Sequence, residues 1–198
     1  MAAAGIARAQ FVGTSMGGIV AMVLASVRQD LVAGAVLNDV GPEIAPEGIR
    51  RIAGYVGVPS RAADWAEAAA YARKLNAFAF PAYGEAVWDR FARRVFREDA
   101  SGAPVLDYDP KIAEPVRQAG AEGLAPPLWP LWGALIAGRP VLVVRGAISD
   151  LLSRDTYARM LASAPTVAGV EVPGVGHAPT LEEPQAHQAL AAFFQANP

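Results

Sequence analysis

The stretch Phe11-Val12-Gly13-Thr14-Ser15-Met16-Gly17-Gly18-Ile19-Val20 sets a serine between glycines, after an apolar pair and before a helix-like apolar run. This order predicts a strand, a sharp turn and a helix, with Ser15 at the apex of the turn. The backbone of such a turn is strained and its neighbours must be small, which explains Gly13 and Gly17, two residues on either side. The turn would expose the hydroxyl and aim the Met16 N–H at the place where an oxyanion forms. The stretch therefore predicts a nucleophile elbow.

Two later segments have the same pattern. In each, an apolar run rich in β-branched residues ends in glycine, and a side chain that can take part in catalysis follows. The first runs from Arg139 to Asp150 and the second from Gly169 to His177. Each is predicted to be a buried strand followed by a loop. Ser15, Asp150 and His177 thus occur in that order, each just beyond the carboxyl end of a predicted strand, and in a parallel sheet such ends share one edge.

With these motifs the chain resembles the serine hydrolases of the α/β-hydrolase superfamily. The resemblance covers Phe11 to Phe194 and rests on three motifs, Gly13-Thr14-Ser15-Met16-Gly17-Gly18, Arg145-Gly146 to Asp150, and Gly174 to His177. It implies a partial α/β-hydrolase fold, in which a mostly parallel sheet of about four retained strands carries flanking helices and a helical cap.

The resemblance also implies a role for each of the three side chains. Ser15 would be the nucleophile, His177 the general base and later acid, and Asp150 the carboxylate that orients the imidazole. Chemistry supports the same roles, because a serine hydroxyl is a poor nucleophile at neutral pH and needs a histidine held in the right tautomer.

The acid has an alternative, because some branches of the superfamily carry it after an earlier strand. Asp39, in Asn38-Asp39-Val40-Gly41-Pro42, stands at that place, although a turn aspartate would occur there too. We favour Asp150, because the spacing from Gly146 matches the commoner pattern of the superfamily.

The beginning of the chain departs from the superfamily, whose members place about four strands before the elbow. Ten residues precede Phe11 here, so we expect an N-terminally truncated hydrolase. The superfamily's strand order would keep the remaining strands side by side and leave the strand at 9–12 as an exposed edge. A second copy or a missing N-terminal segment is expected to pair there. Loss of the second oxyanion donor, which the superfamily takes from an earlier loop, is expected to lower turnover about 10²- to 10³-fold.

The pattern of strands and helices divides the chain into core residues 1–42, a helical cap insertion at 43–138, and core residues 139–198. No strand alternation is seen between 43 and 138, so this part is predicted to be helical. In the superfamily the cap covers the serine and shapes the substrate pocket. Trp129 and Trp132 stand where the chain returns from cap to core, which makes them candidate pocket residues.

Composition limits the classes of function. With 53% hydrophobic and 18% charged residues, the 198-residue chain can bury a core, and the absence of cysteine excludes disulfides and thiolate chemistry. A net charge of −2 argues against nucleic-acid binding. Glycines interrupt the apolar N-terminal region, so we expect no membrane span and a cytoplasmic location. His177 and His187 stand on different predicted elements, so we expect no metal and no cofactor.

The sequence thus predicts acyl transfer from a small ester-like substrate to Ser15, followed by hydrolysis. Two alternatives stay open. One is a carbon–carbon bond hydrolase or enol-lactonase with the same triad, and the other is an inactive or ligand-binding fragment. Serine at the elbow argues against the epoxide hydrolase and haloalkane dehalogenase branches, which need a carboxylate nucleophile.

Overall fold

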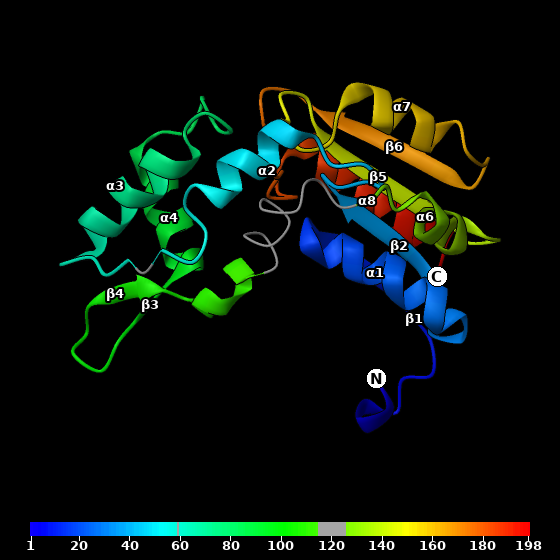
Figure 1. Cartoon of the computed structure of the whole chain (residues 1–198), viewed down its shortest axis with the longest axis horizontal. Helices are drawn as coiled ribbons and strands as arrows, with labels where there is room; N and C mark the ends of the chain where they lie inside the picture. The colour runs from blue at the N-terminus through cyan, green and yellow to red at the C-terminus, as the bar shows by residue number, and fades with distance from the viewer. Residues whose placement is uncertain (59, 115–125) are drawn as a thin grey trace. The chain divides into compact units, whose positions relative to one another are not determined.

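A computed structural model of the chain describes residues 1–58, 60–114 and 126–198. The chain forms two compact units, one made of Met1–Gly48 with Pro126–Pro198 and the other of Ile49–Ala125 (Figure 1). Residues 43–48 and 126–138, which the sequence assigned to the cap, group with the first unit. Within the predicted cap, residue 59 and residues 115–125 lie outside the described part.

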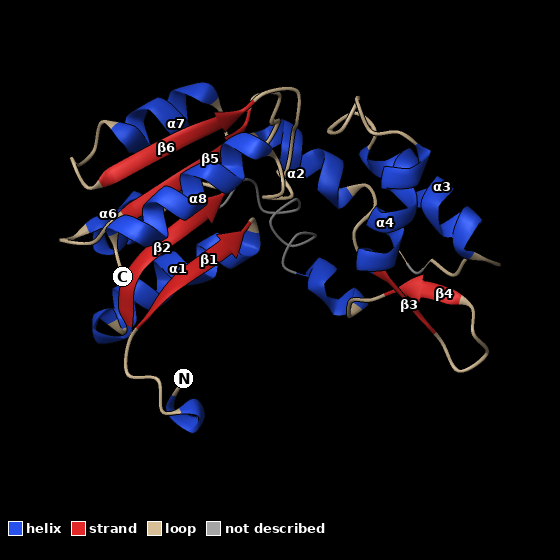
Figure 2. Ribbon diagram, turned by 180° about the vertical axis from the view of Figure 1, so that it is seen from behind, coloured by secondary structure: helices blue, strands red, loops and turns tan. Residues whose placement is uncertain are grey.

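The first unit is a parallel sheet with helices on both faces. Its strands follow the order β1-β2-β5-β6 and pair in parallel throughout. Helix α8 covers one face, and α1, α6 and α7 lie on the other (Figures 1 and 2). The sheet confirms the fold class expected from the sequence. The elements are η1 (Ala2–Ala4), β1 (Ala9–Thr14), α1 (Met16–Val27), η2 (Gln29–Leu31), β2 (Val32–Asn38), α6 (Trp129–Ile136), β5 (Val141–Gly146), α7 (Arg154–Leu161), β6 (Val167–Val172) and α8 (Pro184–Ala196).

Burial along the strands follows their places in the sheet. All six residues of β5 are buried, and so are six of the seven residues of β2, as expected for inner strands covered on both faces. The outer strand β1 has one neighbour, and its Val12 is 50% exposed. The expectation that this strand lies at an edge is therefore confirmed, while its pairing with a second copy or another segment stays a prediction.

The core of the first unit lies between the sheet and the helices α1, α6 and α7. Its side chains are apolar and almost wholly inaccessible, which supplies most of the stabilisation that fixes the strand ends. The largest of them are Met22, Leu37, Trp132, Leu135, Val143, Leu152 and Met160.

The register of the sheet brings the carboxyl ends of its strands together. Thr14 on β1 lies opposite Asn38 on β2, and Asn38 lies opposite Val144 on β5. The residues that follow β1 and β2, Ser15 and Asp39, therefore leave the sheet side by side.

The described residues of the second unit form mainly helices, together with a hairpin that the sequence did not predict. Phe96 pairs with Leu106 in the hairpin, and the side chain of Asp99 closes its turn by accepting the backbone N–H groups of Ser101 and Ala103. The expectation of helices between 43 and 138 did not include these strands, because each strand is only three residues long and too short to show alternation. The elements are α2 (Pro46–Ala53), which begins in the first unit, α3 (Trp65–Asn76), α4 (Glu85–Val95), β3 (Phe96–Glu98), β4 (Pro104–Leu106) and η3 (Pro110–Ile112).

Candidate active site

Ser15 stands between β1 and α1 in a strained backbone conformation. Its φ is 52° and its ψ is −119°, a combination that residues with a side chain rarely adopt. A Cβ at Gly13 would lie 2.5 Å from backbone atoms of Gly17 and Gly18, and a Cβ at Gly18 would overlap the Val40 side chain. A Cβ at Gly17 would meet no heavy atom within 4 Å. The predicted sharp turn is confirmed, but the crowded glycines are 13 and 18, not 13 and 17.

His177 reaches Ser15 from the loop after β6. Its Nε2 lies 3.0 Å from Oγ of Ser15, and its side chain is 10% exposed. The N–H of Ile148 donates to the carbonyl of Val175 at 3.1 Å, which ties this loop to the one after β5. The two loops approach so closely that a Cβ at Gly146 would lie 2.6 Å from the same carbonyl oxygen. The structure thus places the His177 imidazole within hydrogen-bond distance of the Ser15 hydroxyl, the arrangement that the sequence predicts.

Asp39 is the carboxylate on the other side of the imidazole. Its Oδ2 lies 2.9 Å from Nδ1 of His177, and its side chain is wholly buried. A buried carboxylate requires donors, and two more are present. The Gly146 N–H donates to Oδ1 at 2.8 Å, and the Ser149 hydroxyl donates to Oδ2 at 2.6 Å. Asp39 has a φ of 54°, in the left-handed region that aspartate tolerates better than most residues.

This geometry corrects the sequence preference for Asp150, because the contact with Nδ1 of His177 is made by Asp39. The reason is the register of the sheet, which sets Asp39 beside Ser15 on the neighbouring strand. Asp150 stands four residues past the end of β5, and its carbonyl accepts the N–H of Gly48 at 3.0 Å. Spacing along one strand was the weaker guide, since it says nothing about which strand end lies next to the histidine.

Asn38 joins the nucleophile and histidine segments, a role that the sequence analysis missed. Its Nδ2 donates to the Thr14 hydroxyl at 3.0 Å and to the Pro179 carbonyl at 2.8 Å. The backbone carbonyl of Asn38 accepts the Ser15 N–H at 3.0 Å. The available signal was a polar residue at the end of a buried apolar strand, where a side-chain amide must find partners.

The Met16 N–H lies at the start of α1, where helix geometry provides no intrahelical acceptor. The Gly18 and Ile19 N–H groups donate to the Ser15 carbonyl at 2.9 Å and 3.4 Å. The Met16 N–H is thus a backbone donor directly beside the serine, as the sequence predicted.

Trp129 and Trp132 make contacts of a structural kind. Trp132 is 1% exposed and donates from Nε1 to the Ser163 hydroxyl at 3.0 Å, so it belongs to the core. Trp129 donates to the Glu43 carboxylate at 2.5 Å, and the guanidinium of Arg159 lies 4.2 Å from its ring centroid. These contacts hold α6 and α7 together. The suggestion that both line a pocket is corrected for Trp132, whose side chain is enclosed by core residues.

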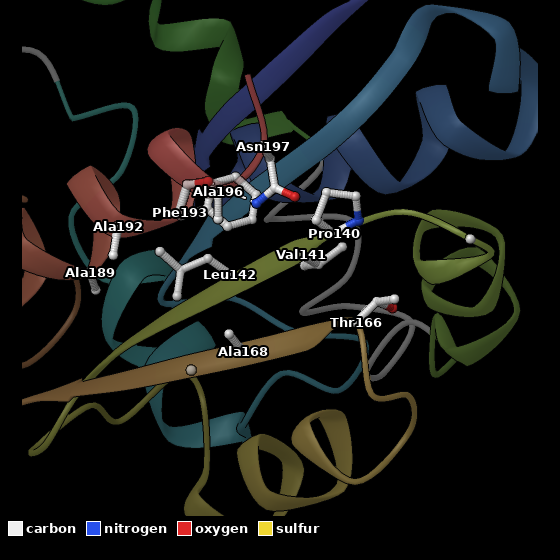
Figure 3. A pocket seen from close by; sticks show the side chains of 12 residues that line it. Pro140, Val141, Leu142, Thr166, Ala168, Ala189, Ala192, Phe193, Ala196 and Asn197 are labelled. Carbon is white, nitrogen blue, oxygen red and sulfur yellow. Dashed lines mark hydrogen bonds between the residues drawn. The ribbon is translucent and has the colours of Figure 1, made fainter.

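An apolar hollow lies at the other end of the sheet (Figure 3). Pro140 and Thr166, near the amino ends of β5 and β6, line it together with Phe193 of α8. It is lined by the amino-terminal parts of these strands, whereas Ser15 and His177 follow carboxyl ends. The hollow is therefore separate from the serine and histidine pair.

Residues 1–58, 60–114 and 126–198 contain neither a metal-binding cluster nor a membrane-spanning helix. No group of three or more His, Asp or Glu side chains there could hold a metal ion. No helix in these ranges combines the length and hydropathy that crossing a membrane requires.

Comparison with known proteins agrees with this fold. The chain belongs to the alpha/beta hydrolase family, whose sequence model matches residues 2–190. The crystal structure of an alpha/beta hydrolase from Novosphingobium aromaticivorans is 43% identical, with a TM-score of 0.89 over 98% of this chain and 67% of that one. The E-2-(acetamidomethylene)succinate hydrolase structure is 24% identical, with a TM-score of 0.75 over 98% of this chain and 68% of that one, a likeness of fold alone.

A curated relative carries a more specific name. The 3-hydroxybutyrate-oligomer hydrolase of Cupriavidus necator is 38% identical over 96% of this chain. The chain spans 66% of that relative's length. The family assignment, which was made from the three motifs at Gly13–Gly18, Arg145–Asp150 and Gly174–His177, is thus confirmed.

Proposed function

We propose that this chain is a serine esterase that works through an acyl-enzyme on Ser15. One observation carries the proposal, the continuous hydrogen-bonded path from Ser15 Oγ to His177 Nε2 at 3.0 Å and from Nδ1 to Asp39 Oδ2 at 2.9 Å. A neutral imidazole whose Nδ1–H donates to a carboxylate has a free lone pair on Nε2. That nitrogen can accept the serine proton.

In the proposed reaction, Ser15 Oγ attacks the ester carbonyl carbon while His177 Nε2 takes the hydroxyl proton. The tetrahedral intermediate collapses when the imidazolium gives that proton to the leaving alkoxide, which releases the alcohol. Water then attacks the acyl-enzyme while His177 Nε2 takes a proton from it. The bond between the acyl carbon and Ser15 Oγ breaks as the imidazolium returns that proton to Oγ, and the carboxylic acid leaves. Asp39 holds the tautomer and stabilises the imidazolium through both steps.

The Met16 N–H is proposed to bind the developing oxyanion. It belongs to the first turn of α1, where the helix dipole favours negative charge, and it follows Ser15 directly in the chain. A backbone donor fixed in this way needs no reorganisation when charge develops on the carbonyl oxygen.

Short esters of 3-hydroxy acids are the first substrates to test. Support comes from the relative that is 38% identical and is named for hydrolysis of 3-hydroxybutyrate oligomers. The triad by itself fits any ester of accessible size.

The test is release of p-nitrophenol from short-chain p-nitrophenyl esters by the purified chain, beside hydrolysis of a 3-hydroxybutyrate dimer, a vinylogous diketone and an enol-lactone. Ester hydrolysis that disappears in Ser15→Ala supports the proposal. Hydrolysis only of the diketone or the lactone would replace it by the corresponding alternative. Ester turnover that persists in a folded Ser15→Ala variant would contradict it.

A further inference from the structure

The loop between β5 and α7 contains a hydroxyl that the reaction does not consume but that contacts the proposed acid, Asp39. Ser149 donates to Oδ2 of Asp39 at 2.6 Å, the same oxygen that meets Nδ1 of His177 at 2.9 Å. One carboxylate oxygen is therefore held between two donors. The other oxygen accepts the Gly146 N–H at 2.8 Å, which limits rotation of the carboxylate further.

The hydroxyl proton of Ser149 has a defined direction. A hydroxyl has one proton and two lone pairs, and the Ser149 oxygen accepts the N–H groups of Leu151 and Leu152 at 3.1 Å each. With both lone pairs engaged, the proton points to the remaining partner, Asp39. A donor with a fixed direction restrains an anion better than a freely rotating one.

Hydrogen bonds from residues of β5 hold the loop that carries Ser149 in place. Arg145 is 3% exposed, and its Nε donates to the Leu152 carbonyl at 2.8 Å while Nη1 pairs with Glu171 at 2.6 Å. The Ser149 N–H donates to the Gly146 carbonyl at 2.9 Å, which closes the turn. These contacts place the hydroxyl on rigid backbone and not on a loose surface loop.

We propose that Ser149 is a positioning residue that holds Oδ2 of Asp39 against Nδ1 of His177. The inference rests on the proposed function for its effect on turnover, but the hydrogen bond itself exists without turnover. Without this hydroxyl the carboxylate keeps the Gly146 N–H and rotates about its Cβ–Cγ bond, so the imidazole is held less firmly. A merely structural role would confine Ser149 to capping the Leu151 and Leu152 N–H groups.

Three variants separate these roles. Ser149→Ala removes the hydroxyl, and Ser149→Thr retains it. The matched control is Ser153→Ala, which removes a hydroxyl in the following turn that accepts the Thr156 N–H at 3.0 Å and donates to the Thr156 hydroxyl at 2.9 Å. The readouts are kcat and KM for a p-nitrophenyl ester and the low-field proton NMR signal of the His177 Nδ1–H.

Ser149→Ala should lower kcat about ten- to one-hundredfold with KM within about twofold, since a hydrogen bond to a charged group is lost. Its Nδ1–H signal should move upfield or broaden. Ser149→Thr should keep the signal, and Ser153→Ala should lower Tm without changing the signal or kcat. If Ser149→Ala is unfolded at the assay temperature, Ser149→Cys replaces it, because the thiol is a weaker donor of similar size and should give a smaller loss in the same direction.

An unchanged Nδ1–H signal and kcat in folded Ser149→Ala or Ser149→Cys would overturn the proposal. Equal effects of Ser149→Ala and Ser153→Ala on the signal would also overturn it, because both would then act through loop stability. Since the NMR signal needs no substrate, it gives a result even if the wild-type chain hydrolyses no ester. Failure of the proposed esterase function can thus be distinguished from failure of the proposed positioning role of Ser149.

Discussion

Substitution of the two candidate acids discriminates between them most sharply. In Asp39→Asn the side chain keeps its size, and its remaining oxygen, in the place of Oδ1, still accepts the N–H of Gly146. The new NH2 group, however, faces Nδ1 of His177, where it can only donate. The imidazole then carries its proton on Nε2, which points at Ser15 and can no longer accept the serine proton.

The size of the effect follows from this change of tautomer. The same substitution in a serine–histidine–aspartate site of the protease type costs about 10⁴-fold in kcat, so we expect a loss of about 10³- to 10⁴-fold for Asp39→Asn. That corresponds to about 4–5.5 kcal/mol in transition-state free energy. Asp150→Asn should change kcat by no more than about threefold, because the contact with Nδ1 of His177 is made by Asp39.

The assay is steady-state hydrolysis of a p-nitrophenyl ester by wild type and both variants, with far-UV circular dichroism and Tm as controls for folding. The account predicts a large loss for Asp39→Asn at nearly unchanged KM. A large loss in Asp150→Asn together with a small one in Asp39→Asn would refute the assignment of the acid and restore the sequence preference.

The remaining predictions concern the support of the site. Asn38→Ala should lower kcat at least about tenfold, as measured by ester turnover, because the elbow and the histidine loop lose their shared amide; unchanged turnover would contradict this role. Gly146→Ala should cost about 1–3 kcal/mol in urea unfolding and reduce turnover, whereas Gly133→Ala, whose Cβ meets nothing within 4 Å, should do neither. Trp132→Phe should lower the free energy of unfolding by about 1–3 kcal/mol while kcat stays within about twofold. A selective rise in KM would instead indicate that Trp132 contacts the substrate. Hydrogen bonds, first from Trp129, lower the pKa of the Glu43 carboxyl, so its stabilisation is present above the unfolded pKa and is lost as pH falls. Urea titrations should therefore show the difference between wild type and Glu43→Gln shrinking between about pH 6 and pH 3.

The strands were predictable because the sequence signals were strong and local, whereas their order followed from the resemblance to the superfamily. Inner strands β2 and β5 are mostly apolar runs, and Gly13 and Gly18 allow the close approaches that the sharp turn at Ser15 needs. The pairing of Ser15 with His177 was also predictable, because both follow carboxyl ends of parallel strands.

The choice of acid could not be made from spacing, because it depends on which strand end lies beside the imidazole. Asp39 and Asp150 both follow strands whose ends share one edge, and only the three-dimensional path of the loops distinguishes them. From the loop after β5, the hydroxyl of Ser149 donates to the carboxylate of Asp39 at 2.6 Å. No single-sequence pattern reports such a contact between distant loops.

Other misses have equally physical causes. The hairpin β3–β4 has strands of three residues, and a period of two cannot be detected over so short a run. Trp132 was placed near the substrate because of its position in the return segment, yet the apolar face of α6 turns it into the core. The direction in which a helical side chain points depends on how the helix packs. The position of the residue along the chain does not reveal this packing.

The central claim is that Ser15 is a nucleophile activated by His177 and Asp39. Its most direct test is reaction of the folded chain with a fluorophosphonate, followed by mass spectrometry of the labelled peptides. The account predicts a single adduct on Ser15 that is absent in Ser15→Ala and forms far more slowly in His177→Ala and Asp39→Asn. A folded wild-type chain that remains unlabelled at Ser15, or that reacts equally fast without the histidine, would contradict the account.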